Sequence, residues 1–557
     1  MDRAQALALL TAPGAPFELQ PVEVYGRSCR GFRDVPATLR ELYFEARSEL
    51  PFIVYADERL TFETAWQNAA SIGALLVNEY GLAKGDRVAI SMRNYPEWIT
   101  AFMAATSVGC IAVAMNSLWT PDEMQYGLQD CGARVLFADQ ERLHRLAQCA
   151  DLPAGLRVLA VRSQDLCGTG AVHLGEALAG VQGAAMPLVE MHPNDDATIL
   201  YTSGSTGHPK GAVSCHRNLV TALRSWELDA QASLLMEGIE PPVPEQQPAT
   251  LLGVPLFHAT GSHAVLLTSY RGQRRVVCMY KWDVEQAAEL IERERINSFV
   301  APPAMTGDLV ELARTTRRDL SCLERLGGGG APRAPEQVRN IDAVLPRAAP
   351  GTGWGMTETN AIGVGINGQE YLERPASSGR CSAVLDLRIV DESGEELPVG
   401  ERGELQVRGT TIFRGYWNRP EATKETFDGD WLKTGDVAYL DADGYLYIVD
   451  RIKDLVIRGG ENIGCGAVEA ALLEHPGVLE ASVYAIPDER LGEEVGAIVY
   501  VTEPLDADAL RGFLRDRLAR FEIPRYLDIS VTPLPRTGSG KIFKRQLREE
   551  AVARHAE

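Results

Sequence analysis

The sequence lacks most of the features that mark membrane, secreted or nucleic-acid-binding chains. No apolar run approaches the roughly 18 residues that a membrane-spanning helix requires. The ten cysteines include no Cys-x-x-Cys pair, which in so long a chain indicates reduced, mostly buried thiols. Lysine and arginine (55) are outnumbered by aspartate and glutamate (76), and the net charge of −21 disfavours nucleic acid as a partner. We therefore expect a cytoplasmic protein.

Neither end of the sequence carries a clear targeting signal. Met1-Asp2-Arg3 followed by AQALALL has too short an apolar part for a secretory signal, and Asp2 stands where that signal needs positive charge. An N-terminal helix is the better interpretation. The closing residues ARHAE match no peroxisomal or retention signal. The length of 557 residues suffices for about three or four domain-sized units.

Between about residues 60 and 350, short apolar runs alternate with longer stretches of helical periodicity. Strands are predicted at Val88–Met92, Ile111–Met115, Ala133–Ala138, Ala197–Tyr201, Leu251–Val254 and Arg275–Met279. Helices are predicted at Glu97–Val108, Val284–Arg295 and Pro335–Leu345. Short apolar strands separated by helices are typical of sheets covered on both faces, which bind ligands at the carboxyl ends of their strands.

The pattern changes near residue 384. Leu385–Val390 and Gly403–Val407 flank turn residues without a long helix, which predicts a β-rich unit over about 380–450. A mixed α/β pattern resumes after Arg451 and continues to the end, over one small-domain length.

The densest local signal is the segment from Tyr201 to Gly211, YTSGSTGHPKG. Its glycines permit tight turns, and its hydroxyls and Lys210 supply the donors that a phosphate-binding loop requires. It is not a Walker loop, because Gly211 rather than Ser or Thr follows Lys210. A plain flexible turn is the alternative, but the placement between a strand and a helix beginning near His216 favours the phosphate loop.

This segment resembles the phosphate loop of the adenylate-forming superfamily, which comprises acyl- and aryl-CoA synthetases, adenylation domains of peptide synthetases and beetle luciferases. The remaining motifs of that family follow in order across about residues 35–550. They are PLFH at 255–258, GGGGAP at 327–332, GWGMTET at 353–359, KTGD at 433–436, DRIKDLVIRGGENI at 450–463 and PRTGSGKIFKR at 535–545.

The resemblance implies an α/β fold with a large N-terminal domain (1–451) of two helix-flanked β-sheets plus a β-barrel. A small, mobile α+β C-terminal domain (455–557) would follow a hinge at 452–454, centred on Lys453. The implied substrates are ATP, coenzyme A and a small carboxylic acid, with Mg²⁺ as cofactor. The oligomeric state stays open, with a homodimer as one option.

The resemblance also assigns the nucleotide site. The residues it implies for ATP and AMP are Thr202, Ser203, Gly204, Ser205, Thr206, Gly207, Lys210, Gly330, Ala331, Trp354, Gly355, Met356, Thr357, Asp436 and Arg451. Glu358 is suited to hold Mg²⁺, which prefers oxygen ligands, and Thr206 joins it in that role. Trp354 offers a flat face for adenine, where many relatives have Tyr. Asp436 can accept hydrogen bonds from both ribose hydroxyls. In isolation these would read as a core tryptophan and a turn aspartate.

Two further residues are expected to take part in catalysis. His258, which is expected to end an apolar strand, would contact the carboxylate, although a lone histidine there is usually structural. Lys541, in a Gly-Ser-Gly-Lys turn, would bridge the carboxylate and the α-phosphate, offsetting the repulsion between two anions. His258 and His263 are five residues apart and no Cys or Glu completes a set, so no transition-metal site is expected.

Thioester formation needs different groups at the same place. In the family the C-terminal domain rotates between half-reactions, and Gly459, Gly460 and Glu461 would then replace Lys541 and bind coenzyme A. The neighbouring Gly464-Cys465-Gly466 is smaller than in many relatives, which leaves the shape of the thiol tunnel open.

The acid pocket is expected to be apolar or small. Its candidate residues are His258, Ala259, Thr260, Gly261, Val300, Pro302, Met305 and the run Gly327, Gly328, Gly329 and Gly330. No Arg or Lys among them could pair a second carboxylate, which favours a monocarboxylic acid. An aliphatic, aryl or steroid-like acyl group would fit equally.

The main interpretation is an ATP-dependent acyl-CoA ligase for a fatty or similar acid. An amino-acid adenylating enzyme that loads a carrier protein is the first alternative, but Phe257-His258-Ala259 lacks the usual Asp for the substrate amine. A luciferase-type oxygenase is disfavoured by the missing peroxisomal tail. A catalytically inactive nucleotide-binding protein is disfavoured by intact Lys541, Glu358 and Asp436.

Overall fold

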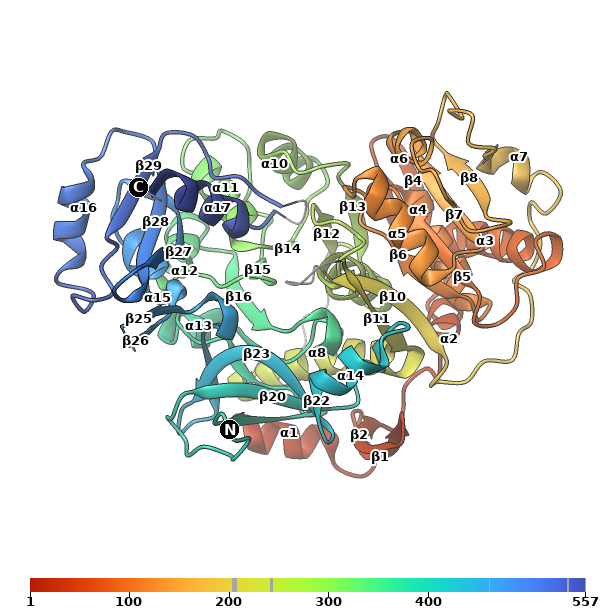
Figure 1. Cartoon of the computed structure of the whole chain (residues 1–557). Helices are drawn as coiled ribbons and strands as arrows, with labels where there is room; N and C mark the ends of the chain where they lie inside the picture. The colour runs from red at the N-terminus through yellow and green to blue at the C-terminus, as the bar shows by residue number, and fades with distance from the viewer. Residues whose placement is uncertain (203–207, 241–243, 460, 538–539, 556–557) are drawn as a thin grey trace.

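The computed structural model describes residues 1–202, 208–240, 244–459, 461–537 and 540–555. Its strands form four sheets of eight, fourteen, five and two strands, which Figure 1 shows with helices between and around them. Within the described ranges, no helix is both long and apolar enough to cross a membrane.

The eight-stranded sheet has the order β21-β11-β10-β6-β5-β7-β8-β9. Its strands are β5 (Arg87–Ser91), β6 (Ile111–Ala114), β7 (Val135–Asp139), β8 (Arg157–Val161), β9 (Val172–His173), β10 (Asp196–Thr202), β11 (Lys210–Cys215) and β21 (Gly415–Tyr416). The six strands from β10 to β9 are parallel, and β11 and β21 extend the sheet antiparallel. The crossover helices are α4 (Pro96–Ser107), α5 (Pro121–Cys131), α6 (Gln140–Leu146) and α7 (Leu174–Leu178).

The fourteen-stranded sheet combines a parallel and an antiparallel half. The parallel half comprises β3 (Pro51–Tyr55), β13 (Arg275–Cys278), β12 (Ala249–Leu252), β14 (Ser298–Ala301), β15 (Arg325–Gly328) and β16 (Ala349–Trp354). β4 (Glu58–Thr61) pairs with β3 at one end of the sheet. The antiparallel half comprises β17 (Val364–Asn367), β18 (Gly379–Cys381), β24 (Tyr445–Arg451), β23 (Trp431–Leu440), β20 (Gly403–Gly409), β19 (Leu385–Val390) and β22 (Phe427–Asp428).

One hydrophobic core joins these two sheets. It includes α3 (Phe62–Ala74) and α4 together with residues of β5 and β12. Trp98 and Phe102 of α4 stack at 5.2 Å between ring centroids and are fully buried. The apolar character of α4 on nearly every side therefore reflects its position between two sheets rather than on a surface.

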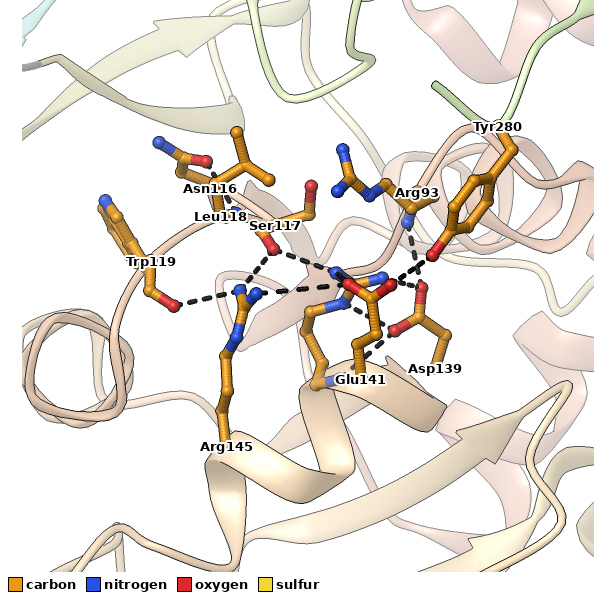
Figure 2. A network of polar contacts seen from close by, with 10 residues as sticks. Arg93, Asn116, Ser117, Leu118, Trp119, Asp139, Glu141, Arg145 and Tyr280 are labelled. Atoms are coloured by element: carbon orange, nitrogen blue, oxygen red, sulfur yellow. Dashed lines mark hydrogen bonds and ion pairs between the residues drawn. The ribbon is translucent and has the colours of Figure 1, made fainter. Parts of the chain in front are cut away.

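Polar contacts fix the loops at the carboxyl ends of β5, β6 and β7 (Figure 2). The buried Arg142 donates to the carboxylate of Asp139, and Arg145 Nη1 donates to the carbonyls of Ser117 and Trp119 at 2.6 and 3.0 Å. Tyr280, in the loop after β13, donates to Glu141 at 2.5 Å. The Tyr280–Glu141 bond ties this edge of the eight-stranded sheet to the fourteen-stranded sheet.

The C-terminal residues form a separate five-stranded sheet, shown in blue beside α11 (Pro303–Ala313) and α12 (Pro335–Val344) in Figure 1. Its strands are β25 (Val456–Arg458), β26 (Glu461–Ile463), β27 (Val478–Asp488), β28 (Gly492–Val501) and β29 (Tyr526–Ser530). Its helices are α15 (Cys465–Leu473), α16 (Ala507–Leu514) and α17 (Lys544–His555). A core of its own lies between the sheet and α15 and α16.

The predicted strands and helices are confirmed to within a few residues, and so is the N-terminal helix, α1 (Arg3–Thr11). Asp2, which argued against a secretory signal, caps α1 by accepting from Gln5 N at 2.8 Å. Figure 1 places α1 alongside α8 (His216–Glu237), below the antiparallel strands, and the hairpin of β1 (Leu19–Val24) and β2 (Arg27–Phe32) follows it.

The helix expected near His216 and the β-rich segment over about 380–450 are confirmed, but two local features were not predicted. The phosphate loop does not lead directly from a strand to a helix, because β11 intervenes and pairs antiparallel with β10, Thr202 opposite Lys210. The apolar run Gly211–Cys215 forms this strand, and Gly211 allows it to approach Ile199, whose side chain would lie 2.7 Å from a Cβ at that position. The β-rich segment over 380–450 is also not a separate sheet, since β18 pairs with β17 and β24 and joins it to the second sheet.

Candidate active site

The predicted adenine and ribose residues lie together. Trp354 ends β16, and its indole Nε1 donates to Asp436 Oδ2 at 2.7 Å. Arg451, at the end of β24, places Nε 2.9 Å from Asp436 Oδ1. Burial raises the pKa of Asp436, while Arg451 and Trp354 act to lower it. One side of the tryptophan ring packs on Gly363, where a Cβ would lie 2.5 Å away. The site thus holds a carboxylate with an aromatic ring fixed beside it.

Glu358 is buried in the turn after β16, within the short helix Thr357–Thr359. Burial raises the pKa of its carboxyl, and the hydrogen bond that Oε1 accepts from Tyr416 Oη at 2.7 Å lowers it. Lys210 Nζ lies 5.2 Å from the centre of the Tyr416 ring. β21 pairs with β11 and brings Tyr416 between the lysine and the glutamate.

Tyr416 is a functional candidate that sequence reasoning missed. It lies 206 residues from Lys210 and in no motif that marks the nucleotide site. Only the pairing of Ala212 with Tyr416 places it there. The phosphate-loop residues Ser203, Gly204, Ser205, Thr206 and Gly207, with the Thr206 metal role, lie outside the described residues. Thr202 and Lys210 flank them at the ends of β10 and β11.

Lys541 extends from the C-terminal segment to Gly330 and toward the predicted acid-pocket residue Thr260. A Cβ on Gly330 would lie 3.2 Å from Lys541 Cε and 3.4 Å from Nζ, with Thr260 Oγ1 at 3.9 Å. The Lys541 side chain is exposed to solvent, although Gly330 of the N-terminal domain lies against part of it. Burial there and the charge of Arg451 lower the pKa of its ammonium group. The structure therefore brings Lys541 next to Gly330, a predicted nucleotide residue, and near Thr260, a predicted acid-pocket residue.

His258 does not end a strand, because β12 stops at Leu252 and the histidine lies in the turn before the π-helix Thr260–Leu267. Burial, followed by the charge of Lys541, lowers the pKa of His258 to about 3. The imidazole is therefore neutral at physiological pH. It can orient a substrate by a hydrogen bond, but it cannot act there as a cationic partner.

The acid-pocket candidates on β14 and β15 lie on both faces of the fourteen-stranded sheet. Val300 of β14 pairs with Gly327 of β15, and a Cβ on Gly327 would lie 2.9 Å from Val300 Cγ2. Gly328 is the next residue, so it faces the opposite side, where a Cβ would lie 2.7 Å from Arg333 Nη2. The buried Arg333 is thus separated from Val300 by the sheet.

The remaining candidates surround the same strand ends. Ala259 and Thr260 begin the π-helix, Pro302 precedes α11, and Gly329 follows β15. Ala331 comes directly after Gly330, and Gly355 and Met356 follow Trp354 in the turn before Glu358. All lie beyond the carboxyl ends of parallel strands, where the α/β pattern predicts ligands.

The residues predicted for the hinge and for coenzyme A lie in the turn after β24 and in the β25–β26 hairpin. Lys453 is exposed in a single 3₁₀ turn, Ile452–Asp454, between β24 and β25. Gly459 and Glu461 belong to the β25–β26 hairpin, where Gly459 N donates to Leu491 O of the same domain at 2.8 Å. Gly460 lies outside the described residues. The structure thus brings Lys541 to the site and leaves this hairpin within the C-terminal sheet.

The small residues after the hinge have a structural explanation. A Cβ on Gly464 would lie 3.1 Å from Val449 Cγ1, and one on Gly466 would lie 3.4 Å from Val449 O. Asp450 Oδ2 also accepts from Cys465 N at 2.6 Å. Gly464 and Gly466 therefore let α15 pack on β24 across the hinge in this domain orientation.

Comparison with known proteins agrees with this geometry. Residues 43–417, more than half of the chain, match the AMP-binding enzyme family, and residues 467–541 match the AMP-binding enzyme C-terminal domain. The chain belongs to the AMP-binding enzyme family. It falls in the adenylate-forming acyl-CoA synthetase branch, an AMP-forming acid–thiol ligase.

The relatives of this AMP-binding enzyme include ligases for different acids. The chain is 32% identical over 511 residues to the long-chain-fatty-acid–CoA ligase FadD13 of Mycobacterium tuberculosis, which covers 89% of this chain and 94% of the relative. It is 34% identical over 471 residues to a feruloyl-CoA synthase of Amycolatopsis sp., covering 84% and 89%. A crystal structure of the anthranilate CoA ligase AuaEII with anthranoyl-AMP aligns with a TM-score of 0.85 at 25% identity, covering 94% of this chain and 99% of that one. ATP and coenzyme A are substrates of this family.

Proposed function

We propose that the enzyme activates an apolar monocarboxylic acid as its acyl-adenylate and transfers the acyl group to coenzyme A, using Mg²⁺ in the first step. The observation that carries this proposal is the position of Lys541 against Gly330 and Thr260, between the acid-pocket candidates and the nucleotide residues. A cation from a second domain at this point suits a reaction between two anions.

In the first half-reaction a carboxylate oxygen of the acid attacks the α-phosphorus of ATP, and the bond to pyrophosphate breaks. The protonated Lys541, beside Gly330, would contact both the carboxylate and the phosphate and so reduce their repulsion as charge develops. Asp436 and Trp354 hold the ribose and adenine, which fixes the α-phosphate relative to the lysine. Lys210, at the end of the phosphate loop, would contact the departing pyrophosphate.

The donor set fits Mg²⁺. Glu358 supplies a buried carboxylate whose Oε1 is oriented by Tyr416, and oxygen ligands of this kind are those that Mg²⁺ prefers. The raised pKa of Glu358 shows that burial disfavours its charge, and a cation bound beside it would reverse that effect. When bound, Mg²⁺ would neutralise charge on the phosphates. Thr206 would be the second protein ligand.

In the second half-reaction the thiol of coenzyme A attacks the acyl carbonyl and AMP leaves. This step needs the β25–β26 hairpin, with Gly459, Gly460 and Glu461, in the place that Lys541 occupies here. Rotation about the exposed turn at Lys453 would exchange them. The rotation must break the Asp450–Cys465 bond, one contact that crosses the hinge.

The apolar acid is supported by the charges near the pocket. Ala259, Thr260, Val300 and Pro302 carry none, and Lys541, beside Gly330, would pair with the single carboxylate that reacts. Arg333 lies behind Gly328 on the other face of the sheet. A second carboxylate in the pocket would therefore be buried without a partner, which is costly. The relatives include a long-chain-fatty-acid–CoA ligase, a feruloyl-CoA synthase and an anthranilate CoA ligase, so the substrate panel should contain both aliphatic and aryl acids.

A substrate panel tests the proposal. Pyrophosphate release and AMP formation are measured with ATP and straight-chain fatty acids, aryl acids, dicarboxylates and amino acids, each with and without coenzyme A. We expect coenzyme A-dependent acyl-thioester formation with at least one apolar monocarboxylate. Better turnover of a dicarboxylate or an amino acid than of every monocarboxylate would contradict the assignment of the pocket.

A further inference from the structure

An ion pair joins the two domains next to the catalytic lysine. Arg536, five residues before Lys541, donates from Nη1 to Asp308 Oδ2 at 2.7 Å and from Nη2 to Asp308 Oδ1 at 2.9 Å. Asp308 belongs to α11 of the N-terminal domain. The bond is bidentate and both side chains are largely buried, with 20% and 29% exposure, so it is stronger and more directional than an ordinary surface pair.

Each side chain of the pair makes a further hydrogen bond within its own domain. Trp282 Nε1 donates to Asp308 Oδ2 at 2.9 Å, which fixes the carboxylate on the N-terminal side. Arg536 Nη2 also donates to Glu480 of β27, which fixes the guanidinium on the C-terminal side. Burial opposes the charge of Arg536, but the two carboxylates outweigh it and raise its pKa. The arginine therefore stays charged and oriented.

Arg536 is also part of the hairpin that carries Lys541. It pairs across the hairpin with Ile542, and Thr537 N donates to Lys541 O at 2.7 Å. Gly540 supplies the turn, with φ of +81°, and a Cβ there would lie 2.7 Å from Met305 Sδ in the first half of α11. The hairpin thus contacts α11 at Met305 and at Asp308, and Lys541 extends past this helix to Gly330.

We infer that Arg536 and Asp308 are positioning residues for the first half-reaction: their ion pair docks the Lys541 hairpin on α11 and so places the lysine for adenylate formation. This inference rests on the proposed function. The pair holds only one orientation of the C-terminal domain, because α11 and β27 belong to different domains. Rotation about Lys453 must separate Arg536 from Asp308 while leaving the Arg536–Glu480 bond intact.

The experiment compares Asp308→Asn with Glu311→Gln. Both substitutions remove one carboxylate from α11, but within the described part of the chain Glu311 pairs with its exposed neighbour Arg314 alone. Adenylate formation is followed by pyrophosphate release, and the second half-reaction is followed with a supplied acyl-adenylate and coenzyme A. We expect Asp308→Asn to lower kcat for adenylate formation by about tenfold or more, as for loss of a hydrogen bond to a charged group. Thioester formation and the KM for ATP should stay at the wild-type values, and Glu311→Gln should match wild type throughout.

A double-mutant cycle of Asp308→Ala and Arg536→Ala keeps the test valid if a single variant is partly destabilised. The cycle measures the interaction between the two side chains separately from the loss of the Arg536–Glu480 bond. We expect the two losses in adenylation to be non-additive. The inference is overturned if Asp308→Asn behaves as Glu311→Gln does, if it slows both half-reactions equally, or if the cycle is additive. A failure of the proposed function would appear differently, as a wild-type enzyme that releases no pyrophosphate with any acid.

Discussion

Trp354 donates its indole N–H to the carboxylate of Asp436 across 2.7 Å, so the predicted adenine platform and the predicted ribose acceptor form one unit. Arg451 completes this unit from the residue that precedes the hinge turn. The predicted nucleotide site is therefore linked to the predicted hinge of the C-terminal domain.

Asp436 should matter more for ATP than its tryptophan donor. Asp436→Asn removes the charge that Arg451 pairs and one acceptor for the ribose, so we expect KM for ATP to rise by about tenfold or more. Trp354→Phe keeps an aromatic face and loses only the hydrogen bond, so it should raise the KM for ATP less than Asp436→Asn does. Initial rates at varied ATP check this, and a larger effect of Trp354→Phe would show that the carboxylate is not the main ribose contact.

Glu358 should control the response to Mg²⁺. Glu358→Gln keeps the size of the side chain and removes the charge that would bind the cation, so half-maximal pyrophosphate release should require more Mg²⁺. Tyr416→Phe removes only the bond at 2.7 Å to Oε1 and should have a smaller effect. Magnesium titrations of both variants at saturating ATP measure this. An unchanged Mg²⁺ requirement in Glu358→Gln would exclude it as a ligand.

The rate of adenylation should fall at a lower pH than it would if the catalytic lysine had an ordinary pKa. Lys541 must be protonated to bridge two anions, and burial together with Arg451 lowers its pKa below the usual 10.5. The rate should therefore fall as pH rises through that lowered value. Profiles of kcat/KM for pyrophosphate release report this group in the free enzyme. The arginine of Lys541→Arg stays protonated, so kcat/KM of this variant should no longer fall at high pH. An unchanged fall in this variant would show that another group causes it. His258, with a pKa of about 3, should add no inflection near neutrality.

Gly330 should tolerate no side chain during adenylate formation. Its φ is +80°, where a Cβ is strained, and that Cβ would crowd Lys541 Nζ at 3.4 Å. Gly330→Ala should therefore slow pyrophosphate release. Gly329→Ala is the matched control, because a Cβ there meets nothing within 4 Å. Equal rates in the two variants would contradict the placement of Lys541.

The sequence predicted the parallel strands and the order of the motifs because apolar runs and glycine-rich turns are local signals. It could not predict β11, since the run Gly211–Cys215 is too short to distinguish a strand from the start of α8. It also could not show that the strands over 380–450 continue the second sheet. That connection depends on the pairing of β18 with β24, about 65 residues further along the chain.

The candidate site shows the same limit. Lys541, Asp436 and Glu358 could be named from motifs, because each lies in a recognisable segment. Tyr416 and the Asp308–Arg536 pair could not, since each depends on residues distant in sequence and brought together by strand pairing or domain contact. The role of Gly464 and Gly466 against Val449 likewise became visible only with the domains in contact.

We propose that one site serves two half-reactions by exchanging parts of the C-terminal domain. Measuring both half-reactions separately in Lys541→Ala and Lys453→Pro tests it most directly. Lys541→Ala loses a charge contact made in the transition state, so pyrophosphate release should slow by about 10²–10³ while thioester formation from a supplied acyl-adenylate continues. Lys453→Pro restricts the exposed hinge, so the adenylate should form and then accumulate. Equal losses of both half-reactions in both variants would contradict domain alternation in this enzyme.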